Sequence, residues 1–342
     1  MKSAQRSKVT LEQVAESARV SRATASRVLT ANPRVSPEAR RAVERAVRKL
    51  GYIPNHAARA LATGRSDAVA LVISEPTNLL FGDPFIPRLV RGIGEVLAER
   101  DIQLILLAPQ STSDLERLER YLAAGHADGA LLISLDGSHP LPRRLAARGV
   151  RFVVGGRPAE PDLFSYVDVD NVGGAFAAVS HLASGQRRMI GTISGPQGLP
   201  AGQDRLSGYR SALEAAGLPL DGGLEEAADF THDGGATAMR VLLGRRPGLD
   251  AVFAASDLMA VGALRALAAA GRRVPEDVAV VGYDDDPLAA STTPLLTSVR
   301  QPIEEMGREM ARLLLDAIQT PRRVILATQL QVRASSGSGG PT

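Results

Sequence analysis

From Asp67 onward, short runs of β-branched residues and leucines alternate with longer segments whose apolar residues recur at helical spacing. Strands are expected at AVALVI (68–73), IQLILL (102–107), GALLI (129–133), RFVVG (151–155), MIGTI (189–193), AVFAA (251–255), VAVVGY (278–283), LTSVR (296–300) and VILATQL (324–330). Strands separated by helices are joined by crossover connections, so the pattern predicts a doubly wound α/β fold with parallel sheets.

The size and composition of the chain indicate more than one globular domain. It has 342 residues, of which 44% are hydrophobic, and it contains no cysteine. The sequence has no apolar run long enough to span a bilayer, and its first residues lack a signal pattern. A cytoplasmic location without membrane contact is therefore expected, and the tail ASSGSGGPT (334–342) has the composition of a disordered segment.

Charge is distributed unevenly between the two ends. Residues 1–65 contain 14 Lys and Arg against 4 Asp and Glu, whereas the remainder contains 26 against 33. A small basic module preceding a large acidic one is typical of a segment that binds nucleic acid on an ordinary globular body. Charge alone is equally compatible with an Arg-rich solvated surface.

The first residues of the basic module predict two short helices joined by a turn. Thr10 can cap the first helix, whose inward positions are Leu11, Val14, Ala15 and Ala18. Ser21 can cap the second, which buries Ala25 and Val28. The outward face of this second helix then carries Arg22, Ala23 and Arg27, flanked by Ser21, Thr24 and Ser26. Hydroxyl groups suit phosphate oxygens and guanidinium groups suit guanine edges, so this face favours DNA.

A third helix has clear signals at both ends. Ser36 is a suitable N-cap, Pro37 occupies the first helical position, and Gly51 is a suitable C-cap. One stripe of this helix is apolar, with Val43, Ala46, Val47 and Leu50. Three helices packed around one small core are therefore expected.

Polar residues directly follow many of the predicted strands. They are Ser74, Glu75, Asp136, Arg157, Ser194, Ser256, Asp257 and Asp284. The carboxyl ends of parallel strands are where α/β sheets bind ligands, so a small-molecule site is expected there.

Sequence features of an enzyme are missing. The five histidines lack metal-ligand spacing, and the sequence has no nucleophile elbow, phosphate loop or dinucleotide fingerprint. The run Asp284–Asp286 does not predict a metal site, because adjacent carboxylates diverge; Asp285 and Asp286 are expected to cap a helix or face solvent. No catalytic activity, cofactor or metal is predicted.

Two stretches, VTLEQVAESARVSRATASRVL (9–29) and RVSPEARRAVERAVRKLGYIPNHAARAL (34–61), resemble the lactose-repressor (LacI/GalR) family, and the resemblance extends over nearly the whole chain. It implies a helix-turn-helix DNA-binding domain at 1–51. Arg22, Ala23 and Arg27 would contact base edges, while Ser21, Thr24 and Ser26 would hold phosphates. Ala23 lacks a hydrogen-bonding group, so it could contact only a thymine methyl or leave room.

The resemblance also implies a hinge helix and linker at 52–66. Asn55, Ala58 and Leu61 would lie on DNA, with Leu61 as a wedge in the minor groove and Ala58 allowing two hinge helices of a homodimer to approach each other. The segment is too short to be stable alone, so it would become helical only against a partner. An alternative interpretation is an Ala-rich linker with Leu61 packed on the neighbouring domain.

For residues 67–336 the resemblance implies two lobes of periplasmic-binding-protein type with a small-molecule effector in the cleft. Lobe 1 would comprise about 67–167 and 302–323, and lobe 2 about 168–301 and 324–336, followed by a disordered tail at 337–342. The implied effector-binding residues are Phe81, Asp83, Phe85, Arg157, Arg205, Asp257 and Asp284.

Other roles remain open for several of these residues. Phe81 and Phe85, four residues apart, could belong to the core, and Arg157 could pair with an acid of the other lobe. Arg205 is expected to open a helix, where a cation is disfavoured by the dipole, so that a ligand role is favoured.

The sequence thus predicts a homodimeric regulator, a repressor of carbohydrate-utilisation genes, that binds a pseudo-palindromic operator under control of a sugar effector. A purine- or nucleoside-responsive corepressed regulator is the first alternative. A sugar-binding protein or sugar enzyme fused to a DNA-binding head is disfavoured, because neither a signal peptide nor catalytic motifs are present.

Overall fold

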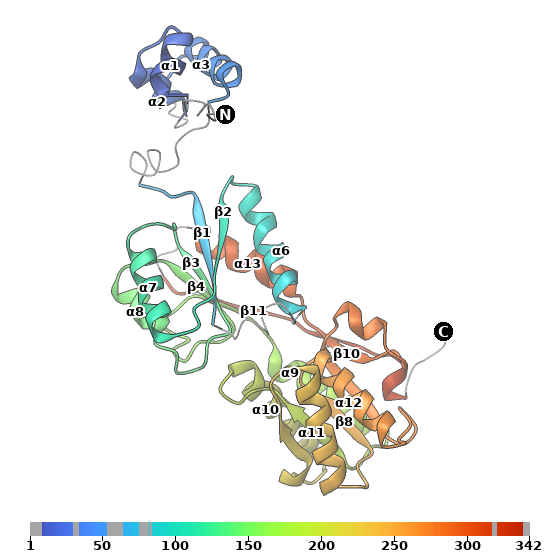
Figure 1. Ribbon diagram of the computed structural model, residues 1–342. Coiled ribbons are helices and arrows are strands. Elements are labelled where there is room, and N and C mark those ends of the chain that lie inside the picture. The colour runs from blue at the N-terminus through green and yellow to red at the C-terminus, as the bar shows by residue number, and fades with distance from the viewer. Residues whose placement is uncertain are drawn as a thin grey trace, which may run out of the picture. The chain divides into compact units, whose positions relative to one another are not determined.

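The computed structural model describes residues 9–29, 34–52, 64–74, 82, 84–316 and 320–337. They form two compact units, one N-terminal up to Ala68 with Gly125–Asp128, the other comprising the rest of the chain. Figure 1 shows the helices of the N-terminal unit and the sheets of the larger unit. None of the described helices is long and apolar enough to cross a membrane.

The N-terminal unit has the three helices predicted: α1 (Leu11–Ser17), α2 (Arg22–Leu29) and α3 (Pro37–Leu50). Thr10 caps α1, Ser21 accepts a hydrogen bond from the N–H of Thr24 at the start of α2, and Ser36 caps α3. Gly51 ends α3 with φ of 63°, in the left-handed region where glycine is favoured. The buried side chains of the three helices form one small core, with Val14, Ala15, Ala25, Val28, Val43 and Ala46.

The larger unit contains two six-stranded sheets. The first contains β1 (Ala68–Ile73), β2 (Gln103–Leu107), β3 (Ala130–Ile133), β4 (Phe152–Gly155), β5 (Tyr166–Val169) and β11 (Arg323–Leu326), in the order β11-β5-β4-β3-β1-β2. The second contains β6 (Ile190–Ser194), β7 (Glu225–Ala227), β8 (Ala251–Ala254), β9 (Ala279–Asp284), β10 (Thr297–Arg300) and β12 (Gln329–Gln331), in the order β12-β10-β9-β8-β6-β7. The pairing of β12 with β10 is antiparallel, whereas β9, β8, β6 and β7 pair in parallel.

Helices cover both sheets. Those of the first lobe are α6 (Phe85–Ala98), α7 (Thr112–Ala123), α8 (Leu141–Ala147) and α13 (Ile303–Leu315). Those of the second lobe are α9 (Asn171–Ser184), α10 (Pro200–Ala215), α11 (His232–Arg245) and α12 (Asp257–Ala269), with short 3₁₀ turns at Gly222–Leu224, Pro287–Ala290 and Ala334–Ser336. One apolar core lies in the first lobe, between its sheet and α6 and α13; two flank the second sheet.

The chain passes between the lobes three times, between β5 and α9, β10 and α13, and β11 and β12. The predicted crossing near 301 agrees with this topology. The one expected near 167 follows Val169, and the one expected near 323 follows Leu326, because β11 pairs with β5 over four residues before the chain leaves the first sheet.

All nine predicted strands are present, but VILATQL is divided into β11 and β12, which belong to different sheets. Two strands, β5 and β7, were not predicted. The tail prediction was wrong for residues 334–337, where Ser335 is fully buried and donates a hydrogen bond to the carbonyl of Val280.

Candidate functional site

The exposed face of α2 carries the side chains predicted to meet DNA. Arg22, Ala23 and Arg27 are exposed, while Ala25 and Val28 on the opposite face are buried. Arg22 pairs with Glu12 of α1 at 2.6 Å, but both side chains are more than 60% exposed, and ion pairs of this kind contribute little stability. The guanidinium group can therefore exchange Glu12 for a phosphate or base at small cost.

The hydroxyl groups beside this face have local partners. Ser21 and Thr24 share a hydrogen bond of 2.9 Å between their side chains, and Ser26 is half-buried. Asn55, Ala58 and Leu61, predicted to contact DNA from the hinge, lie outside the described residues. So do Phe81 and Asp83, predicted to contact the effector.

A cavity of about 450 Å³ lies between the two lobes. Its lining includes the last residues of β3, β4, β5 and β9, the segments that follow β3, β4, β7, β8 and β10, and the starts of α6 and α10. The cavity thus lies at the carboxyl ends of the parallel strands, where the sequence predicted a ligand site. Its volume falls within the range of about 300 to 1,000 Å³ found for small-molecule sites.

Arg205 occupies the centre of one end of the cavity, here called the floor. Its guanidinium carbon lies 3.7 Å from the centre of the Tyr283 ring, Nε donates to Asn171 Oδ1 at 2.9 Å, and Nη1 donates to the carbonyl of Ala255 at 2.6 Å. The expectation that Arg205 opens a helix was wrong, since α10 begins at Pro200. The helix dipole therefore gives no support for a ligand role, and the contacts with Tyr283, Asn171 and Ala255 hold the guanidinium group in place.

Asp284 lies beside Arg205 at the end of β9. Its Oδ1 is 3.5 Å from Arg205 Nη1 and accepts a hydrogen bond from the amide of Gln301. The backbone of Asp284 has φ of 113°, a conformation that non-glycine residues rarely adopt. Such strain persists where surrounding contacts hold it, and here it turns the carboxylate to the cavity lining.

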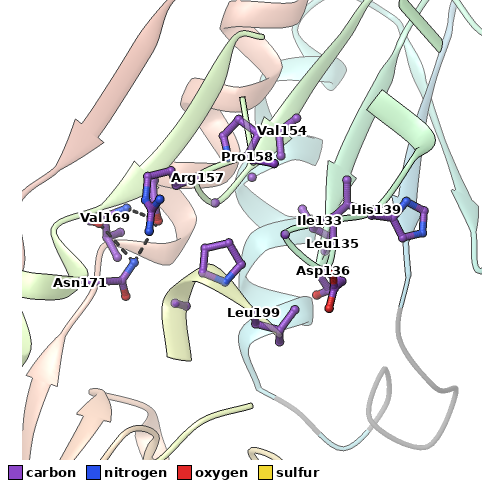
Figure 2. Close-up of a pocket in the computed structure, with 18 of the residues that line it drawn as sticks. Ile133, Leu135, Asp136, His139, Val154, Arg157, Pro158, Val169, Asn171 and Leu199 are labelled. Carbon is purple, nitrogen blue, oxygen red and sulfur yellow. Dashed lines mark hydrogen bonds between the residues drawn. The ribbon is translucent and has the colours of Figure 1, made fainter. Parts of the chain in front are cut away.

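Asp168 and Asn171 complete the floor, and neither was predicted from the sequence. Figure 2 shows Asn171 beside Val169. Asn171 Nδ2 donates to Asp168 Oδ1 at 3.1 Å and to the carbonyl of Val169 at 3.3 Å. Burial raises the pKa of Asp168 to about 6, although the N–H of Val169 lowers it. Gln301, between β10 and α13, also lines the cavity and was also missed. Asp168, Asn171 and Gln301 all lie where the chain crosses between the lobes, and no local sequence motif marks these crossings.

Asp257 does not line the cavity, although the family resemblance implied contact with the effector. It is fully buried, and it accepts hydrogen bonds from Ser298 Oγ at 2.6 Å and from the N–H of Asp286 at 2.8 Å. Burial raises its pKa well above the ordinary range. Its contacts position the loop that follows Asp284.

Asp285 and Asp286 do not face solvent, contrary to expectation, and although Asp286 occupies the N-cap position of the 3₁₀ turn Pro287–Ala290, its side chain makes no capping hydrogen bond. Asp286 is 2% exposed and pairs at 3.0 Å with Arg88 of α6, in the other lobe. Asp285 accepts a hydrogen bond from Arg333 at 2.6 Å. Asp286 thus connects its loop to α6, and Asp285 connects the same loop to the segment that contains Arg333. No cluster of potential metal ligands occurs among the described residues.

Arg157 lines the cavity and also connects the lobes. It follows β4 in the first lobe, and its Nε donates to Asp204 of α10 in the second lobe at 3.2 Å. Pairing with an acid of the other lobe was one of the two roles left open by the sequence. Phe85, similarly, lines the cavity while packing against the core of the first lobe.

Models of known protein families match both the N-terminal part of the chain and the larger part that follows it. Residues 10–55 match the model of bacterial regulatory proteins of the lacI family, and residues 179–336 match a periplasmic binding protein-like domain. The HTH-type transcriptional regulator CelR of Thermobifida fusca is 52% identical over 336 residues, covering 96% of this chain and 99% of CelR.

Solved structures agree with this assignment. A transcriptional regulator CelR–cellobiose complex has a TM-score of 0.77 at 50% identity, covering 96% of this chain and all of that chain. A lac repressor dimer bound to operator and the anti-inducer ONPF has a TM-score of 0.84 at 25% identity, covering 96% and 99%. These relatives are regulators rather than enzymes. The chain therefore belongs to the LacI family of bacterial transcriptional regulators.

Proposed function

We propose that this regulator represses carbohydrate-utilisation genes and that its effector is a sugar bound in the cavity between the lobes, with cellobiose as the first candidate. The floor of the cavity is the observation that carries this proposal. Arg205, Asn171 and Asp284 together present donors and acceptors that are already held in place by Tyr283 and Gln301. Sugar hydroxyls both donate and accept, so they suit such a set.

The charge balance of the floor favours a neutral ligand. Arg205 lies 3.5 Å from Asp284, and Arg157 is paired with Asp204, so neither cation is left to bind a phosphate or carboxylate of the ligand. The 50% identical CelR structure that contains cellobiose supports the same class of ligand.

A purine is the second candidate effector. Three phenylalanines, Phe85, Phe164 and Phe230, line the cavity and offer faces on which a base could stack. The same faces can pack against a pyranose ring, so the two ligand classes are separated by experiment.

The DNA-binding mode follows from the exposed face of α2. We infer that this helix enters the major groove, with Arg22 and Arg27 on base edges and Ser21, Thr24 and Ser26 towards phosphates. Two copies of the chain would bind a pseudo-palindromic operator in the cytoplasm. The operator-bound dimer of the related lac repressor supports this arrangement.

The effector class is tested by the melting shift of the full chain against mono- and disaccharides, their phosphates, nucleobases and nucleosides. A ligand present at 100 times its Kd stabilises the folded chain by about 2.7 kcal/mol, which is readily measured. We expect cellobiose to raise the Tm and nucleobases to leave it unchanged. A nucleobase shift without a sugar shift would establish the purine candidate instead.

A further inference from the structure

The cavity has a second polar end, lined by residues 134–139, which follow β3 in the first lobe. From the loop 195–199, which follows β6 in the second lobe, Leu199 lines the cavity beside them. In the first sheet β3 lies two strands from β5, and in the second β6 lies two strands from β9. At about 4.8 Å per strand, this end is roughly 10 Å from the floor along both sheet edges. Figure 2 shows Asp136 and His139 across the cavity from Asn171.

The two loops touch directly. The N–H of Gly137 donates to the carbonyl of Gly198 at 3.0 Å, which joins the lobes at this end. A methyl group on Gly198 would lie 2.5 Å from Asp136 Oδ2, so only glycine allows this approach.

Asp136 has an oxygen available for a ligand. Its Oδ1 accepts from the N–H of Ser138 at 2.8 Å and from the Ser138 hydroxyl at 2.6 Å, whereas Oδ2 accepts no hydrogen bond from the described part of the chain. The two bonds from Ser138 hold the pKa of Asp136 below its ordinary range, so the group is a charged acceptor at neutral pH.

Two further polar residues line this end. His139 Nδ1 accepts the N–H of Leu141 at 3.2 Å, which places the ring proton of the neutral imidazole on Nε2, 3.3 Å from Ser74 Oγ. Ser134 has φ of 57°, in the left-handed region, and no other described residue bonds its hydroxyl. Between the two polar ends the lining is largely apolar, with Val154, Pro158 and Pro200.

We propose that this end is a second sugar subsite, in which Asp136 accepts a hydroxyl of the second ring of a disaccharide, and that it selects the length of the effector. The inference rests on the proposed sugar effector. A single pyranose ring held by Arg205 and Asp284 is too short to reach Asp136. A disaccharide reaches both ends, and its apolar ring faces pack against the side chains between them.

A sugar ring in this second subsite would affect how the two lobes close, because the subsite lies between them. Because 134–139 and 195–199 belong to different lobes, a second ring seated there contacts both lobes at once. A ligand shifts the equilibrium between open and closed lobes only by binding one of these two states more tightly than the other. A disaccharide, which contacts both lobes through its second ring, therefore favours the closed state more strongly than a monosaccharide does.

The first test measures cellobiose and D-glucose binding to the full chain and to Asp136→Ala by calorimetry. Asp136→Ala should weaken cellobiose binding about tenfold or more, the loss expected on removing a hydrogen bond to a charged group, and leave glucose binding unchanged. Asp229→Ala is the matched control, because Asp229 makes the same pair of bonds to Thr231 but does not line the cavity.

Gly198→Ala provides a second test that keeps every polar group. The added methyl displaces Asp136, so cellobiose binding should weaken while glucose binding and the Tm are retained. Gly244→Ala is its control, since a methyl there meets nothing within 4 Å. Equal loss of both sugars, or no loss in either variant, would overturn the second subsite while leaving the sugar effector intact. A wild-type chain that binds neither sugar would refute the proposed effector itself.

Discussion

Asp168 is a carboxyl group that the fold keeps away from water at the floor of the cavity. Its pKa is raised by burial from 3.8 to about 6. Between pH 3.8 and about 6 the folded chain binds more protons at this group than the unfolded chain does. The stability that the group contributes is therefore greatest at low pH and is lost as the pH rises through about 6.

Asp168→Asn should therefore raise the Tm at pH 7.5 and leave it nearly unchanged at pH 4. Asparagine has the same shape and keeps the oxygen that accepts from Val169 and Asn171. Thermal unfolding at the two pH values measures the effect. A gain of equal size at both values would show that ionisation of Asp168 does not limit stability.

Arg27 is the residue of α2 whose proposed role can be tested most directly. Arg27→Ala should relax the base preference at one position in each half-site and cost about 1 to 3 kcal/mol of operator affinity. Selection from random duplex DNA, followed by anisotropy titration, measures both. Arg45→Ala, which removes an exposed arginine from α3, should weaken binding to all sequences alike. If Arg27→Ala behaves like this control, Arg27 contacts phosphate rather than a base.

The family resemblance pointed to some residues of the cavity but not to others. Arg205 and Asp284, which it implied as effector-binding residues, line the cavity. The same resemblance implied Asp257, yet this residue is fully buried outside the cavity lining, where Ser298 and the N–H of Asp286 donate hydrogen bonds to its two carboxylate oxygens. Asp136 was found only as one of several polar residues that follow strands, and Asp168 was not found, because its role depends on contacts between distant segments that spacing along the chain cannot reveal.

Helix pairs in the second lobe approach closely through glycines. A methyl on Gly262 of α12 would lie 2.0 Å from the carbonyl oxygen of His232, and one on Gly235 of α11 would lie 2.3 Å from that of Met259. Both obstacles are backbone atoms, so neither helix can relieve the clash by moving a side chain. The two glycines set the distance between α11 and α12.

Gly262→Ala should destabilise the chain by about 1 to 3 kcal/mol, the usual cost of overpacking. Gly244→Ala on α11 should be neutral or slightly stabilising, because its methyl would meet nothing and alanine favours helices. Urea unfolding of the two variants measures the difference. Equal stability would mean that the helices can separate without loss of packing.

The strands that were not predicted share a physical cause. The sequence of β5, YVDV, is interrupted by the acidic residue Asp168, which lies next to a crossing between the lobes. The sequence of β7, EEA, is polar, and the strand lies at the edge of its sheet. Neither carries the apolar run that indicates a buried strand. The division of VILATQL has no sequence signal, since Ala327 and Thr328 pass between sheets without a glycine or proline.

Within the described ranges of the chain, two ion pairs join the lobes: Arg157 with Asp204, and Arg88 with Asp286. Asp204 is the more accessible acid, so its pair stabilises the closed arrangement only modestly. Uneven charge along the sequence was compatible with a DNA-binding module ahead of a larger domain, but it did not distinguish that module from an Arg-rich solvated surface. The pairing of these lobe residues depends on the tertiary fold.

Asp204→Asn should weaken sugar binding by up to about fivefold, which corresponds to about 1 kcal/mol, because the binding-competent closed state becomes less populated. Asp277→Asn removes an ion pair with Arg273 within the second lobe and should leave binding unchanged. Calorimetry reports affinity, and small-angle scattering reports lobe opening. Tighter sugar binding in Asp204→Asn would mean that the pair opposes closure.

The link between the cavity and DNA is measured most directly by anisotropy titration of selected operator DNA, with and without saturating cellobiose. We expect cellobiose to lower operator affinity by about 5-fold to 150-fold, the range that a coupling of about 1 to 3 kcal/mol produces. Arg27→Ala provides a reference for weakened DNA contact without a change in sugar binding. Unchanged operator affinity at saturating bound cellobiose would contradict control of this regulator by sugar.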